Sequence, residues 1–174
     1  MSSESDIETE KFFQDLIFTK NIDVVDKRLL LLGRPGAILN LDVLVSLFKP
    51  LLDVNPKILE DAGSLALKGI MADYKKRFSD PQQILDFIKK TSPLYGAGGI
   101  DFSIQTDKII VSIQPSVFAE EYVKLFGASD KPVCYFSRGI LSQLFGSIFD
   151  RNLVFNEVNC VAKGDGACVF VADL

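Results

Sequence analysis

Three cysteines and a complete lack of histidine define the chemistry open to this 174-residue chain. Without histidine it cannot build a Ser-His-Asp or Cys-His nucleophile, a histidine general base or a histidine metal ligand. A site for a soft metal ion must therefore use thiolates, completed by a carboxylate, water or the backbone. The available thiols are Cys134, Cys160 and Cys168. We assign no catalytic residue from the sequence.

The last two cysteines fall on the two strands of an expected C-terminal hairpin. With a four-residue loop, Val161 opposes Cys168, and the thiols of Cys160 and Cys168 point to opposite faces. With a three-residue loop closed by glycine, Ala162 opposes Cys168 and the two thiols share a face. Glu157 precedes Cys160 by three residues, so it joins the thiols only if the strand bulges or begins between them.

Three thiolates and one carboxylate would form a closed four-ligand zinc site without an open position for catalysis. Such a site keeps a net negative charge, so it needs nearby backbone N–H donors or a cation. Arg138 and Lys163 are the candidate cations. The alternative is three buried free thiols, because cysteine is among the most frequently buried residues. The spacing lacks a paired C-x-x-C motif and leaves both possibilities open.

A resemblance favours the metal site. Residues 133–170 resemble the signature of the 4-vinyl reductase domain family. The matching residues are Val133-Cys134-Tyr135-Phe136, Gly139 and Glu157-x-x-Cys160-x-Ala162-x-Gly164-Asp165-x-x-Cys168-x-Phe170. The resemblance implies a small-molecule-binding module, similar in fold to subunits of the TRAPP trafficking complex and often dimeric. In related sensors of aromatic compounds, three Cys and one Glu hold a structural zinc. The matching ligands here are Cys134, Glu157, Cys160 and Cys168.

The resemblance also implies an apolar ligand cavity between the sheet and the helices. Its candidate lining residues are Val111, Ile113, Tyr122, Leu144, Phe145 and Phe155. Ordinary core is the alternative for each of them. Phenol sensors of the family engage the phenolic hydroxyl with His and Trp, and this chain has neither. We therefore expect a ligand more apolar than phenol, such as a hydrocarbon, acyl chain, terpenoid or tetrapyrrole fragment, or one bound by Tyr95, Tyr122 or Tyr135.

These observations favour a zinc-braced sensor or carrier domain, implied to be a homodimer, that binds a hydrophobic small molecule. Because the related activators continue into an ATPase and a DNA-binding domain, we expect signalling here through a protein partner. One alternative is an enzyme or accessory subunit of tetrapyrrole vinyl reduction. The sequence leans against an enzyme, since it has no dinucleotide fingerprint and no cysteine run for an iron–sulfur cluster. A trafficking-like scaffold without a ligand is the other alternative, and a large exposed apolar patch over a filled interior would favour it.

The elements that must position these residues predict an α+β fold, a helical block packed on an antiparallel sheet. Helical spacing or capping residues predict helices over 10–18, 41–50, 56–74, 81–88, 116–126 and 140–149. Asn55 and Asp80 each precede a proline and are predicted N-caps, and Pro50 is predicted to stop the second helix. Alternation and turn residues predict strands over 28–32, 102–104, 109–113, 153–162 and 168–172.

Charge is concentrated at the N-terminus. Residues 1–10 contain four acidic residues and no basic one, and we expect an acidic mobile tail there, followed by a single domain over 11–174. The rest of the chain is neutral and has no basic block for a phosphate backbone, so nucleic-acid binding is not expected. The apolar run Leu29–Leu32 is too short to span a membrane, and the acidic start is unlike a signal peptide. We expect a cytoplasmic protein with reduced thiols.

Overall fold

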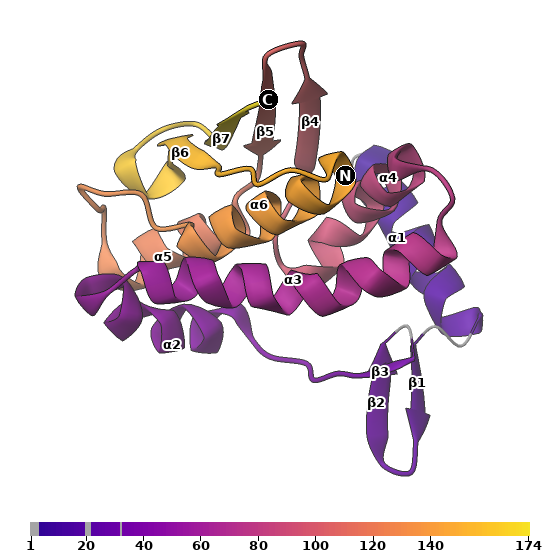
Figure 1. The fold of residues 1–174 in the computed structure, drawn as a ribbon. Helices are drawn as coiled ribbons and strands as arrows, with labels where there is room; N and C mark the ends of the chain where they lie inside the picture. Colours follow the sequence, from indigo (N-terminus) through magenta and orange to yellow (C-terminus); the bar gives the residue numbers. More distant parts are fainter. Residues whose placement is uncertain (1–3, 20–21, 32) are drawn as a thin grey trace. The chain divides into compact units, whose positions relative to one another are not determined.

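The computed structural model describes residues 4–19, 22–31 and 33–174. These form two compact units, Met1–Asn40 and Leu41–Leu174 (Figure 1). The expected division into a tail over 1–10 and a single domain over 11–174 stays a prediction. Among the residues that the structure describes, none of the helices is both long enough and apolar enough to cross a bilayer.

The first unit joins one helix to a small antiparallel sheet. Its elements are α1 (Glu4–Phe18), β1 (Ile22–Val25), β2 (Arg28–Leu31) and β3 (Arg34–Pro35), and the strands lie in the order β1-β2-β3. The helix begins at Glu4, well before the predicted start at residue 10. Strand β2 lies at the predicted position, but it is exposed or only half-buried along its length, because so small a sheet covers little of its own surface. Leu32, the last residue of that predicted strand, lies outside the described residues.

The second unit contains the other helices. They are α2 (Leu41–Val54), α3 (Lys57–Arg77), α4 (Pro81–Thr91), the 3₁₀-helix η1 (Ser92–Tyr95), α5 (Val117–Phe126) and α6 (Tyr135–Phe149). Asp80 caps α4 as predicted, because its carboxylate accepts a hydrogen bond of 2.9 Å from the N–H of Gln82. The predicted Asn55 cap was wrong, since Pro56 holds that position and makes no side-chain cap bond. Pro50 lies inside α2 and does not stop it; the carbonyl of Ser46, which it deprives of a partner, lies on an exposed turn within reach of water.

The sheet of this unit is wholly antiparallel. Its strands are β4 (Ile100–Ile104), β5 (Lys108–Ile113), β6 (Asn156–Asn159) and β7 (Cys168–Asp173), in the order β4-β5-β7-β6. Alternate residues of β5 and β7 are buried, so Val111 and its partner Phe170 belong to one core-facing row. Cys168 is the first residue of this row on β7, opposite Ile113. The α+β class predicted from the sequence is confirmed.

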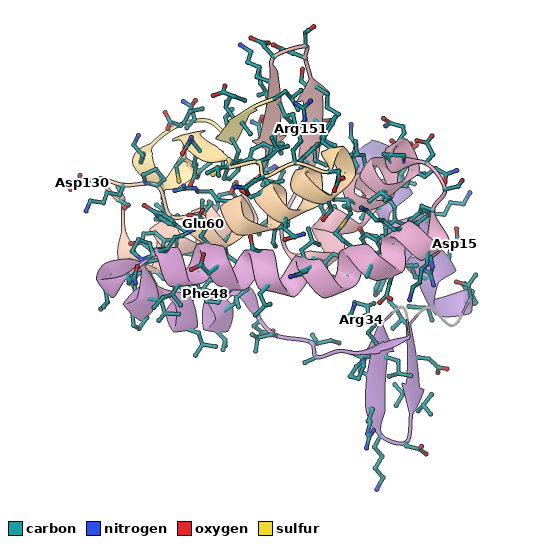
Figure 2. The ribbon with its side chains drawn as sticks, viewed as in Figure 1. Asp15, Arg34, Phe48, Glu60, Asp130 and Arg151 are labelled. Carbon is teal, nitrogen blue, oxygen red and sulfur yellow. The ribbon has the colours of Figure 1, made fainter. Side chains whose placement is uncertain are left out.

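Helix α6 lies between the sheet and α3 (Figures 1 and 2). On the sheet side, the ring of Phe145 packs edge-on against that of Phe102 on β4, with centroids 5.6 Å apart. On the other side the backbones of α3 and α6 touch. A Cβ added at Gly139 would overlap with the carbonyl oxygen of Glu60. The Ser64 hydroxyl donates a 3.0 Å hydrogen bond to the Gly139 carbonyl. This contact fixes the position of α6, which begins next to Cys134.

Candidate metal centre

The structure brings the four predicted metal ligands together. Cys134 precedes the first residue of α6, Glu157 lies on β6, Cys160 follows β6, and Cys168 begins β7. The three Sγ atoms and a carboxylate oxygen of Glu157 all lie within 4.8 Å of one another. All four side chains are buried, the cysteines at 0–3% exposure and Glu157 at 9%. The cluster joins the start of α6 to the two terminal strands.

A β-bulge brings Glu157 to the sulfur atoms. Glu157 pairs with Phe170, and Asn159 pairs with the preceding residue of β7, Val169, so Val158 is an extra residue in β6. On a regular strand, residues three apart face opposite sides of the sheet. The extra residue reverses that relation and lets Glu157 share a side with Cys160. The sequence analysis made a bulge the condition for Glu157 to join the thiols, and the structure meets that condition.

Neither predicted register of the terminal hairpin is observed. Strand β6 ends at Asn159, and the chain passes through Cys160 into a 3₁₀ turn, η2 (Val161–Lys163). The N–H of Cys160 donates a 2.7 Å hydrogen bond to the carboxylate of Asp165. This local bond favours a tight turn over further strand pairing, so the connection is longer than either predicted loop. Cys160 and Cys168 nevertheless approach to 4.0 Å between their Sγ atoms.

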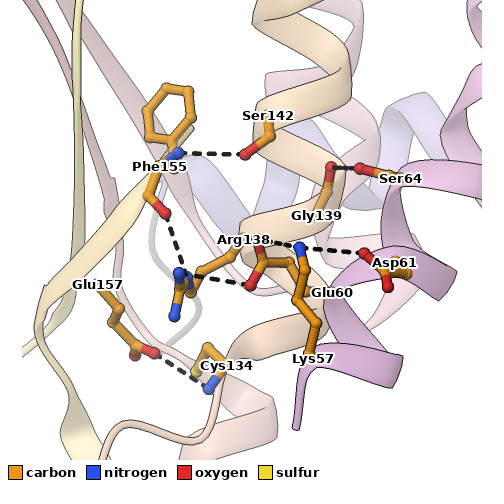
Figure 3. Close-up of polar contacts among 10 residues, drawn as sticks. All are labelled: Lys57, Glu60, Asp61, Ser64, Cys134, Arg138, Gly139, Ser142, Phe155 and Glu157. Atoms are coloured by element: carbon orange, nitrogen blue, oxygen red, sulfur yellow. Dashed lines mark hydrogen bonds and ion pairs between the residues drawn. The ribbon is translucent and has the colours of Figure 1, made fainter. Parts of the chain in front are cut away.

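The spacing of the sulfur atoms fits a tetrahedral ion. The Sγ of Cys168 lies 3.6 Å from that of Cys134 and 4.0 Å from that of Cys160. Sulfur ligands of tetrahedral zinc, with bonds of about 2.3 Å, lie about 3.8 Å apart. Glu157 supplies the fourth position. Its Oε2 accepts a 3.1 Å hydrogen bond from the N–H of Cys134, whereas its buried Oε1 has no partner among the described residues (Figure 3). A metal ion would satisfy this costly buried oxygen, so the residues present fit a four-coordinate zinc.

Protons compete with a metal at this cluster. Burial raises the pKa of Glu157 to about 8, and the nearby Cys160 adds to the effect. Hydrogen bonds with Cys160 and Cys168, together with burial, raise the pKa of Cys134 well above its usual value. At neutral pH both Cys134 and Glu157 therefore hold protons when no metal is bound. A metal ion must displace these protons, which makes binding weaken as the pH falls.

Cys168 has the opposite character. Hydrogen bonds from Cys134 and Cys160 lower the pKa of its thiol to about 4, and the Ser116 hydroxyl and the N–H of Val161 act in the same direction. The Val161 nitrogen lies 3.4 Å from the sulfur. The sequence analysis missed Ser116, which it assigned as a helix cap; in the structure Ser116 makes no side-chain cap bond. It also assigned Asp165 only to a glycine-rich turn. Both roles depend on contacts between segments that are not adjacent in sequence.

Backbone N–H groups, not the two candidate cations, are directed at the ligands. Arg138 instead donates through Nε to the carbonyl of Phe155 at 3.1 Å, and its guanidinium lies 3.4 Å from the carboxylate of Glu60 (Figure 3). Lys163 is exposed. Of the two alternatives for offsetting the negative charge, the structure thus provides N–H donors, from Cys134 and Val161. Arg138 connects the strand after α6 to α3.

Replacing Glu157 with glutamine is expected to stabilise the metal-free protein at pH 8 and to leave it almost unchanged at pH 4.5. Folded Glu157 holds its proton up to about pH 8, whereas the unfolded group releases it near the ordinary value of 4.5. The folded state therefore loses stability from this group as the pH rises through that window. Since each pH unit counts for about 1.4 kcal/mol, the difference should reach a few kcal/mol. Denaturant unfolding with a chelator at both pH values measures it.

The comparison with wild type isolates Glu157 because both proteins contain Cys168. The lowered pKa of Cys168 adds stability as the pH rises above about 4, in the opposite direction to Glu157. That contribution largely cancels in the difference between the variant and wild type. Equal stability differences at pH 4.5 and pH 8 would show that Glu157 is not held in its protonated form.

The six predicted pocket residues all belong to one buried core, at 0–7% exposure. The rings of Phe145 and Phe155 pack together with centroids 5.4 Å apart. Tyr122 and Tyr135 also line a groove of about 430 Å³ beside the loop that precedes Cys134. Tyr95 is half-exposed. A ligand cavity lined by these residues stays a prediction.

Comparison with known proteins places the chain among its relatives. The vinyl-4-reductase (V-4-R) domain family matches residues 109–174, which include all four predicted ligands. The uncharacterized protein MJ1460 of Methanocaldococcus jannaschii is 30% identical over 115 residues, 66% of this chain and 68% of that protein. MJ0745 of the same organism is 26% identical over 66 residues, 38% of this chain; the match spans only 34% of that protein.

A solved structure shows the same fold. The phenol-responsive sensory domain of the transcription activator PoxR, determined with phenol, matches with a TM-score of 0.73 and 14% sequence identity. The match covers 99% of this chain and 91% of that domain. The likeness to TRAPP subunits that the sequence resemblance implied stays a prediction. With a relative at 30% identity and the family match over the last two-fifths of the sequence, this chain belongs to the vinyl-4-reductase domain family.

Proposed function

We propose that this chain is a zinc-braced domain that binds a hydrophobic small molecule and acts through a protein partner. The proposal rests on the convergence of three cysteine sulfurs and the Glu157 carboxylate within 4.8 Å. Zinc would supply a positive charge and four directional bonds at this point. Cys134 would hold the start of α6, while Cys160 and Cys168 would hold the turn between the last two strands. Because the protein fills all four positions, the metal would brace the domain without catalysing a reaction.

The ligand assignment rests on the fold and on the character of the core. The PoxR domain, which shares this fold, is phenol-responsive. In this chain the corresponding interior between α6 and the sheet contains Phe145, Phe155, Val111 and Leu144, all almost completely buried. A site without histidine or tryptophan has few groups to bind a buried hydroxyl. We therefore assign the ligand to the class of hydrocarbons, acyl chains, terpenoids or tetrapyrrole fragments.

Native mass spectrometry of the zinc-loaded protein should detect a bound apolar molecule, and an apolar ligand panel should raise the melting temperature. The Val111→Phe variant tests the site, because a larger side chain would fill the cavity and remove the thermal shift. Ile104→Phe is the matched control: Ile104 is 45% exposed at the end of β4, so the shift should persist.

Two results would contradict this assignment. One is the absence of both a bound molecule and any thermal shift in zinc-loaded wild type, which would favour the scaffold without a ligand. The other is a Val111→Phe variant that unfolds several degrees below wild type, since that would show a filled core in place of a cavity. A nicotinamide- or flavin-dependent activity of the purified chain would instead favour the vinyl-reduction alternative.

A further inference from the structure

Helix α3 is apolar on two opposite sides. Its inner side packs into the core through Leu59, Leu67, Met71 and Tyr74, at 2–8% exposure. The opposite side presents an outer stripe to solvent, which consists of Ile58, Ala62, Leu65, Gly69 and Ala72. Leu65 is 73% exposed and Ile58 is 47% exposed. A helix with apolar residues on both sides normally packs on both, so the outer stripe lacks a partner in the isolated chain.

The preceding helix adds to this exposed apolar surface. Helix α2 exposes Val43, Leu47 and Val54, at 42%, 61% and 85%. These residues also recur at helical spacing, on the side away from the buried Val45. Single exposed apolar residues are common, but five large ones on two consecutive helices indicate an interaction surface.

We propose that the outer stripe of α3 binds the outer stripe of a second copy of this chain, with the two helices antiparallel. The stripe repeats at alternating intervals of four and three residues, the pattern with which helices pack along each other. It is also complementary to itself. About a two-fold axis midway between Leu65 and Gly69, each Leu65 meets the Gly69 of the other copy, and each Ala62 meets Ala72. The side chain missing at Gly69 leaves space for the leucine.

Charge supports the antiparallel direction. Asp61 flanks the outer stripe near its N-terminal end, and Lys75 flanks it on the same side near its C-terminal end. An antiparallel two-fold pair places Asp61 of each copy beside Lys75 of the other, which adds two equivalent ion pairs to the 3.0 Å pair that Asp61 makes with Lys57. A parallel pair would place like charges side by side. Lys68 lies close to the two-fold axis, and its long side chain can turn its charge into solvent.

The test is the oligomeric state of the zinc-loaded full chain, measured by sedimentation at several concentrations. We expect wild type to form a dimer and Leu65→Glu to raise its dissociation constant by at least about 100-fold. Leu65 is mostly exposed, so the zinc content and the circular dichroism of the variant should match wild type. Ile104→Glu places the same charge at another exposed apolar residue and should leave the dimer unchanged.

A charge exchange tests the direction of the helices. Asp61→Lys and Lys75→Asp should each weaken the dimer about tenfold, and the double variant should restore most of the loss. A wild type that is monomeric at about 100 μM would overturn the proposal. A dimer that survives Leu65→Glu would also overturn it, because another face must then form the contact. Neither result affects the proposed metal or ligand site, which have their own measurements.

Discussion

Cys168→Ser is expected to abolish zinc binding and to lower the free energy of unfolding by several kcal/mol. Cys168 is completely buried, begins the central strand β7, and has both of the other sulfurs within 4.0 Å. A serine hydroxyl is a poor zinc ligand, so three ligands would remain around an incomplete site. Structural zinc contributes about 10 kcal/mol or more of apparent binding free energy at neutral pH. Metal analysis and denaturant unfolding measure the two effects.

The decisive control is wild type from which a chelator has removed the metal. If zinc carries the effect, metal-free wild type and Cys168→Ser should have unfolding free energies within about 1–2 kcal/mol of each other. If the substitution costs the same several kcal/mol in the presence of the chelator, the loss comes from packing and hydrogen bonding. Freshly reduced wild type that contains no zinc would support the alternative of three buried free thiols.

Local signals predicted the parts of this protein that depend on local interactions. Alternation over 109–113 matches β5, and Asp80 caps α4 through an N–H two residues away. The four ligands were also identified, because the family signature places them by spacing. The bulge that carries Glu157 was only a condition, since a bulge is set by pairing with β7 and leaves no mark on the sequence of β6 alone.

Helix α3 shows what apolar spacing leaves undetermined. Ile58, Leu59, Leu65 and Tyr74 all belong to the helical pattern over 56–74, and in the structure they lie on two opposite sides of one helix. A period of 3.6 residues indicates a helix, but a helix with two apolar sides does not reveal which one faces its own core. That choice is made by α6, which packs on the side of Leu67 and Gly63.

The contact between α3 and α6 leads to the second large effect, a loss of about 3 kcal/mol in stability on Gly139→Ala. In an exposed helix this substitution would stabilise the protein by about 1 kcal/mol, so the sign itself is diagnostic. At Gly139 the new Cβ would overlap with the Glu60 carbonyl oxygen and lie 2.9 Å from the Ser64 nitrogen, and backbone cannot rotate away as a side chain can. The two helices must separate, which also stretches the ion pair between Arg138 and Glu60.

Gly166→Ala is the matched control for Gly139→Ala. A Cβ at Gly166 would have no heavy atom within 4 Å, so its unfolding free energy should stay within about 0.5 kcal/mol of wild type. The zinc affinity of Gly139→Ala provides a second readout. Because Cys134 immediately precedes α6, moving that helix away from α3 shifts one ligand against the other three and should weaken zinc binding. A Gly139→Ala protein with raised stability and unchanged zinc affinity would mean that the backbones of α3 and α6 do not touch, and that the metal centre is positioned by the sheet alone.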